Sequence, residues 1–230
     1  MKIHWFQHVP FEGLGAIRSW IEERGHEEEC VRLFAGDSLP EADDVEFLVI
    51  MGGPMSVNDE EGYPWLVEEK KLVRQLVEAG KPVFGVCLGA QMIASSLGAS
   101  IYGGPELEIG WFPVRAAPES TDASFSFQEE ATVLHWHGET FDLPEGAIRM
   151  ASSPVCPNQA YLLRERVIGT QFHYEGSPDA VEGFLENSYE GISSLNTYVQ
   201  TPEEIREGAR KFSKANQVQL FRMLDFLVRS

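Results

Sequence analysis

The chain has 230 residues, of which 43% are hydrophobic and 23% are charged, a composition typical of a folded globular protein and not of a disordered or fibrous one. Its 36 acidic and 18 basic residues give a formal net charge of -18, which repels nucleic-acid phosphates and anionic lipid surfaces. No apolar run approaches the roughly 18 residues that a membrane span needs. We therefore expect neither nucleic acid nor a membrane as a partner.

The three cysteines, Cys30, Cys87 and Cys156, are far apart and leave one unpaired after any pairing. A disulfide framework is therefore not expected. Polar residues interrupt the N-terminus too early for the apolar region of a secretory leader. Both observations favour a protein of the reducing cytoplasm.

The first hundred residues alternate between short apolar runs and segments with helical spacing. We predict strands over 2–7, 30–34, 45–51 and 82–86, and helices over 15–25, 64–79 and 88–97. The run 45–51 is almost continuously apolar, as expected for a strand that is covered on both faces. This alternation predicts a parallel sheet with helices on both sides, in which ligands bind at the carboxyl ends of the strands.

The pattern changes after residue 100. We predict short strands near 108–115, 132–136, 148–151, 159–163 and 167–172, and helices over 178–187 and 202–228. No linker-like or repetitive segment divides the chain, so we expect one domain. Residues 1–190 would form its core and residues 191–230 a helical C-terminal extension of the same domain.

The segment around Cys87 carries the strongest signal of chemistry. Gly85-Val86-Cys87-Leu88-Gly89 lies between a predicted strand and a predicted helix, the context of a nucleophile elbow, where glycines allow a strained and crowded turn. A free thiol has a pKa of about 8.5, and a helix N-terminus lowers it by stabilising the thiolate. We therefore predict that Cys87 is a nucleophile, and we assign Cys30 and Cys156 the commoner role of small buried hydrophobic residues.

A base for this thiol is expected at His173, which ends an apolar strand, with Glu175 two residues further on. Side chains two apart on a strand project to the same side, so the carboxylate can orient the imidazole. The glycines of Gly52-Gly53-Pro54 end the preceding strand of the predicted sheet. Their N–H groups, with that of Leu88, could form an oxyanion hole.

These motifs resemble those of the class I glutamine amidotransferases, the Cys-His-Glu family that includes the glutaminase part of GMP synthase. The resemblance covers most of the first 190 residues and adds the motifs at 108–111 and 137–139. It implies that Cys87 is the nucleophile, His173 the base and Glu175 its orienter, with oxyanion donors at Gly53 and Leu88. It also implies a glutamine site formed by Gly52, Gln91, Trp136, His137 and Gly138.

The expected fold class is α/β: a flavodoxin-like, mostly parallel sheet with helices on both faces and a small additional antiparallel strand region. The expected activity is hydrolysis of the glutamine side-chain amide through a cysteinyl thioester. Two alternatives stay open, namely a γ-glutamyl peptide hydrolase with the same triad and a non-catalytic module on the same scaffold. The sequence has no P-loop, so amination of an acceptor would require a separate synthetase subunit.

No cofactor or metal is expected from the sequence. Gly13-x-Gly15 lacks the third glycine of a dinucleotide fingerprint, since Arg18 occupies that position. Alternate histidines at His135 and His137 could share one strand face and bind zinc, but no third ligand is evident at a suitable spacing. A substrate-side or structural role is therefore predicted for this pair, and a structural role for His4, His8 and His26.

Overall fold

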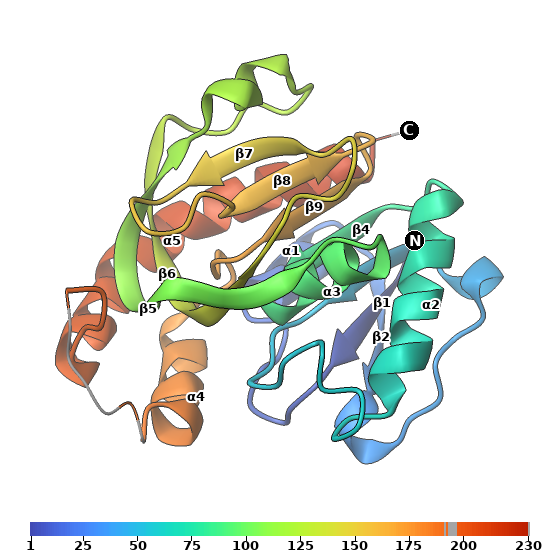
Figure 1. The fold of residues 1–230 in the computed structure, drawn as a ribbon, viewed down its shortest axis with the longest axis horizontal. Helices are drawn as coiled ribbons and strands as arrows, with labels where there is room; N and C mark the ends of the chain where they lie inside the picture. The colour runs from blue at the N-terminus through green and yellow to red at the C-terminus, as the bar shows by residue number, and fades with distance from the viewer. Residues whose placement is uncertain (191, 193–196, 230) are drawn as a thin grey trace.

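The computed structural model describes residues 1–190, 192 and 197–229 (Figure 1). Nine strands form one sheet in the order β2-β1-β3-β4-β9-β8-β7-β5-β6. The strands are β1 (Lys2–Gln7), β2 (Glu27–Arg32), β3 (Phe47–Ile50), β4 (Val83–Val86), β5 (Ile101–Ala116), β6 (Glu130–Phe141), β7 (Ile148–Ser152), β8 (Ala160–Leu163) and β9 (Val167–Thr170).

The sheet has a parallel part and an antiparallel part that share β9. The four pairings from β2 to β9 are parallel, and the four from β9 to β6 are antiparallel. The predicted α/β class is confirmed, and the antiparallel part is more extensive than expected. Its largest piece is the long ribbon of β5 and β6, which continues through a register shift between Gly103 and Glu108.

Five α-helices cover the sheet. They are α1 (Ala16–Glu23), α2 (Trp65–Glu78), α3 (Leu88–Ser96), α4 (Pro178–Ser188) and α5 (Pro202–Leu227), and short 3-10 turns span Leu33–Ala35, Ala42–Asp44 and Pro118–Asp122. The strand predicted over 30–34 instead begins at Glu27 and ends at Arg32. Among the described strands β2 pairs with β1 alone, so it is an edge strand, and its exposed acidic residues leave it without an apolar run at its start.

Strand β3 illustrates how the sheet is buried on both faces. Phe47 and Val49 belong to the hydrophobic core that includes α1 and α5, whereas Leu48 and Ile50 belong to the core that includes α2 and α3. All four side chains are fully buried. The nearly continuous apolar sequence of this strand therefore reflects helices packed on both sides.

Helix α5 packs against the rest of the chain at both ends. The capping box of Thr201 and Glu204 begins it, and the indole of Trp111 donates to the carbonyl of Ile205 over 2.8 Å. Near its C-terminus, the indole of Trp20 donates to Asp225 over 2.8 Å. We propose on these contacts that α5 folds as part of the same domain as the core.

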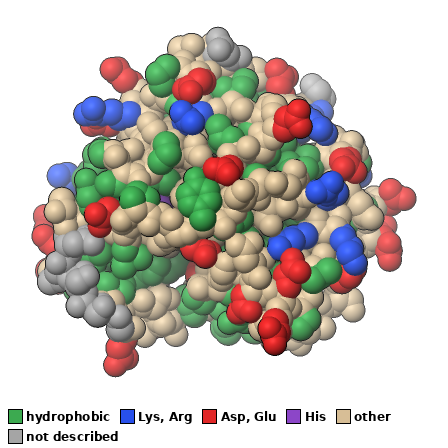
Figure 2. Space-filling model, viewed as in Figure 1, with side chains coloured by type: hydrophobic (Ala, Val, Ile, Leu, Met, Phe, Trp, Pro, Cys, Tyr) green, Lys and Arg blue, Asp and Glu red, His purple; other side chains and the backbone are tan. Residues whose placement is uncertain are grey.

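One face of the surface shows no segregation of charged side chains by sign (Figure 2). On the face in Figure 2, acidic and basic side chains are interspersed among apolar ones. In the described part of the chain, no helix has both the length and the apolar character required to cross a membrane.

Candidate active site

Cys87 lies on a strained turn between β4 and α3. Its φ of 51° is in the left-handed region, which a non-glycine residue rarely adopts. A Cβ on Gly85 would lie 2.6 Å from the backbone of Gly89, and one on Gly89 would lie 2.1 Å from the carbonyl oxygen of Ile50. Both glycines are thus required by close backbone approach, which is the packing expected of a nucleophile elbow.

Cys87 is buried, and the polar neighbours of its sulfur include Trp136 and Gln171. The thiol lies 3.7 Å from the carbonyl oxygen of Trp136, to which it can donate. The side-chain amide of Gln171 donates to the sulfur over 3.6 Å. Gln171 was not singled out from the sequence, because a lone glutamine after a strand carries no signal of its own.

His173 and Glu175 form a buried pair beside this sulfur. The imidazole Nδ1 lies 2.6 Å from the carboxylate Oε1, and the backbone N–H of His173 donates to Leu134 O, which fixes the segment beyond β9. Burial lowers the pKa of His173, but the Glu175 carboxylate and the Cys87 sulfur outweigh it, so this pKa lies well above its usual value. The structure therefore brings together the three residues that the sequence singled out for chemistry.

A buried ion pair between His8 and Glu69 contacts the Gly52-Gly53 turn. His8 Nδ1 lies 3.2 Å from Gly52 O, and His8 Nε2 lies 3.0 Å from Glu69 on α2. Since a carbonyl can only accept, Nδ1 is the donor. The carbonyl of Gly52 and the N–H of Gly53 belong to one planar peptide, so His8 fixes the direction of that N–H.

Glu12, in the loop after β1, is a second residue that the sequence did not suggest. Glu12 is buried, and its carboxyl group touches Gly52, where an added Cβ would lie 2.1 Å from Oε2 and 3.4 Å from His173 Cε1. Burial raises the pKa of Glu12 to about 7, with the charge of Glu175 adding to this and that of His173 opposing it. Gly52 is therefore required to leave room for a carboxyl group next to the imidazole.

A cavity of about 420 Å³ opens over the sulfur. Its wall includes Cys87 and His173, the predicted oxyanion residue Gly53, and four predicted substrate residues, Gln91, Trp136, His137 and Gly138. Three predicted residues do not line it: Glu175 is buried against His173, Leu88 is buried at the start of α3, and Gly52 packs against Glu12. The side-chain nitrogen of Gln91 is already bonded to Glu139 O and Gln171 Oε1.

Beside the cavity, Glu108 lies against the two alternate histidines of β6. Glu108 is directly opposite His137 in the β5–β6 register, and it was not considered as a partner of His135 and His137 from sequence spacing. All three side chains are buried. A third possible ligand group, which the sequence spacing does not reveal, therefore lies beside the two histidines.

Comparison with known proteins gives the family. The model of the class I glutamine amidotransferase family matches residues 15–190. The chain belongs to the class I glutamine amidotransferases. The glutamine amidotransferase-like protein YfeJ of Salmonella typhimurium is 34% identical over 99% of this chain and 97% of its own length. The GMP synthase of Streptomyces avermitilis is 34% identical over 56% of this chain but only 23% of its own length.

Solved structures agree with this class I amidotransferase assignment. A glutamine amidotransferase from Thermotoga maritima superposes with a TM-score of 0.90 at 29% identity, over 100% of this chain and 99% of that one. A glutamine amidotransferase from Methylobacillus flagellatus gives 0.89 at 29% identity, over 100% and 96%. The resemblance that the motifs of the sequence carry is thus confirmed at the level of family and fold.

Proposed function

We propose that this class I amidotransferase hydrolyses the side-chain amide of glutamine through a thioester on Cys87. The proposal rests on the meeting, at the wall of one cavity, of the strained Cys87 elbow with His173, which the buried Glu175 carboxylate contacts from the other side of the ring. A nucleophile, a base and an orienting carboxylate are the three parts that covalent amide hydrolysis requires.

In the first half-reaction, the Cys87 thiolate attacks the amide carbon and the charge moves to the carbonyl oxygen. The N–H groups of Gly53 and Leu88 are proposed to stabilise this oxyanion. His173 then gives its proton to the departing nitrogen, and ammonia leaves as the thioester forms.

In the second half-reaction, His173 takes a proton from water, which attacks the thioester and releases glutamate and the thiol. Glu175 keeps the imidazole oriented and stabilises its charged form in both steps. The backbone around Trp136, His137 and Gly138, together with Gln91, is proposed to hold the rest of the substrate. Because Gly52 does not line the cavity, its proposed contribution is to admit Glu12 beside the imidazole.

The cavity also favours a second candidate, hydrolysis of γ-glutamyl peptides or amines. Apolar side chains line part of its wall, namely Leu107, Ile109, Phe184 and Ile192. Departing ammonia would make no apolar contacts with this wall. A larger apolar leaving group would pack against it. The chemistry at Cys87 is the same in both candidates.

A direct comparison of substrates separates the two. The purified chain is assayed for ammonia release from free glutamine and, at equal concentration, for cleavage of γ-glutamyl dipeptides with small and with apolar leaving groups. A higher kcat/KM for glutamine supports the glutaminase, with transfer of ammonia to a separate synthetase subunit. A higher value for the dipeptides supports the peptidase and contradicts the first proposal.

Substitution of Glu69 tests whether the buried His8–Glu69 pair, which contacts the Gly52-Gly53 turn, affects catalysis. We expect Glu69→Gln to lower kcat by about 10-fold to 100-fold with little change in KM, less than the roughly 10²–10³ lost when one oxyanion donor is deleted outright. The reason is that His8 loses the charge that fixes its orientation toward Gly52. Glu68→Gln is the matched control, because Glu68 is the exposed neighbour on α2. Equal kcat values in the two variants would contradict this role.

We expect Glu12 to make the free energy of unfolding depend on pH. Folding raises its pKa from 4.5 to about 7, so the stability it contributes is complete below pH 4.5 and is lost as pH rises from there through about 7. Glu12→Gln stays neutral, and we expect it to exceed the parent by on the order of 3 kcal/mol in free energy of unfolding at pH 8.5, and by little at pH 4.5. Urea unfolding at both pH values measures this difference.

The control for this measurement is Glu61→Gln, at an exposed loop position. It is expected to change stability little at either pH. A Glu12→Gln difference that is the same at both pH values would show that the carboxyl group does not change its charge over this range.

A further inference from the structure

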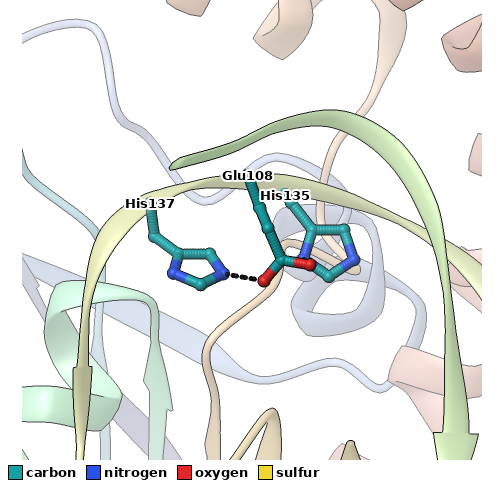
Figure 3. A group of neighbouring side chains, drawn as sticks. All are labelled: Glu108, His135 and His137. Carbon is teal, nitrogen blue, oxygen red and sulfur yellow. Dashed lines mark ion pairs between the residues drawn. The ribbon is translucent and has the colours of Figure 1, made fainter. Parts of the chain in front are cut away.

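Three buried side chains of the β5–β6 ribbon converge beside the active-site cavity (Figure 3). One potential ligand atom from each of Glu108, His135 and His137 lies within 4.8 Å of the others. His137 Nε2 is 3.0 Å from Glu108 Oε2, and His135 Nδ1 is 3.8 Å from Glu108 Oε1. The cross-strand pairing of Glu108 with His137 produces this meeting.

The hydrogen bonding of His137 leaves one ring nitrogen without a suitable partner. Its Nδ1 lies 3.1 Å from the carbonyl oxygen of Glu139, which can only accept, so Nδ1 carries a hydrogen. In the neutral ring, Nε2 then presents a lone pair toward Glu108 Oε2, and among the described residues no other group pairs with this buried nitrogen. Two acceptors that face each other out of contact with water repel, unless a positive species lies between them.

The surroundings of the carboxylate resemble the support that metal ligands receive. Ser153 donates to Glu108 Oε1 over 2.9 Å, and Gln159 donates to Oε2 over 2.8 Å. Ligating carboxylates and histidines are commonly held in this way by outer hydrogen bonds, here including Glu139 O on His137. Separations of 3.0 and 3.8 Å are close to those between ligands that each lie about 2.0–2.2 Å from one zinc ion.

We propose that Glu108, His135 and His137 bind one divalent transition-metal ion, with Zn²⁺ as the ion that suits two imidazoles and one carboxylate. The site lies between β5 and β6, and His137 also belongs to the cavity wall. The bound ion would join the two strands and hold the backbone of 136–138 in place at the cavity. The competing arrangement is a metal-free imidazolium–carboxylate pair.

Metal binding is measured on the full chain in a Cys87→Ala background, which removes the nearby nucleophilic thiol as a competing ligand. After treatment with a chelator, the protein is titrated with Zn²⁺ in the presence of a chromophoric chelator. We expect one tightly held Zn²⁺ per chain and a rise in melting temperature on loading. Glu108→Gln and His137→Asn in the same background should each weaken binding at least about 10-fold. His4→Asn, at a buried histidine of β1, is the matched control and should bind as the parent does.

The Cys87→Ala parent gives a second readout by itself. This readout does not depend on how well the Glu108→Gln and His137→Asn variants fold. Co²⁺ loaded in place of Zn²⁺ should give visible bands of nitrogen and oxygen ligation, without the charge-transfer band of a thiolate. Failure of the parent to bind one ion, a thiolate band, or equal binding by folded Glu108→Gln and His137→Asn would overturn the proposal. None of these readouts depends on the glutaminase activity.

Discussion

Replacement of Cys87 by alanine is expected to reduce the hydrolysis of glutamine, or of a γ-glutamyl substrate, by at least about 10⁴-fold, to the limit of detection. The reason is that the sulfur is proposed to form the covalent intermediate, and no other described nucleophile lies at the same place on the cavity wall. Stability should change little, because the substitution removes a single atom from a turn whose shape depends on Gly85 and Gly89. Steady-state release of ammonia and thermal unfolding measure the two effects.

The other two cysteines provide the controls. Cys30 is half-buried on the edge strand β2, and Cys156 is buried next to Thr140, away from the cavity wall. Burial raises the pKa of both thiols, which keeps them protonated and unreactive. Cys30→Ala and Cys156→Ala should retain activity within a few-fold of the parent. Full activity in Cys87→Ala would show that Cys87 is not the nucleophile.

Replacement of Glu175 by glutamine is expected to lower kcat/KM by about 10²–10⁴-fold, while the cysteine remains in place. Glutamine has nearly the same shape but no charge, so the imidazole loses the partner that orients it at 2.6 Å. Glu145→Gln, at an exposed position in the turn before β7, is the control and should leave kcat/KM unchanged.

The same variant should also change the pH dependence. The Glu175 carboxylate is the main influence that raises the pKa of His173 against the effect of burial. The charged imidazole would therefore be lost at a lower pH in Glu175→Gln, and the alkaline limb of kcat/KM should move toward lower pH. A lower kcat/KM at every pH, with the alkaline limb at an unchanged pH, would indicate that the carboxylate orients the ring but does not stabilise its charge.

The sequence predicted the parts of the site that depend on neighbouring residues. Two glycines around Cys87 and a spacing of two between His173 and Glu175 are local patterns, and the chain order of strands and helices placed them at the carboxyl ends of strands. The parallel strands, buried on both faces, were equally readable from continuous apolar runs such as that of β3.

The parts that the sequence did not reveal depend on strand order and register. Glu12 reaches the imidazole only because the loop after β1 lies beside the ends of β3 and β9. In the sequence, Glu69 is one of several acidic residues on an amphipathic helix. Only its contact with His8, which follows β1, distinguishes it. Glu108 meets His137 only through the antiparallel register of β5 and β6, whose length the search for short apolar runs underestimated.

Covalent labelling tests the central claim, that Cys87 attacks a γ-glutamyl carbonyl, most directly. The purified chain is treated with a glutamine analogue that carries an electrophile in place of the side-chain amide, and the intact and digested protein are weighed by mass spectrometry. We predict one adduct per chain, located on Cys87, and protection by an excess of substrate. No adduct, or labelling shared equally with Cys30 and Cys156, would contradict the account.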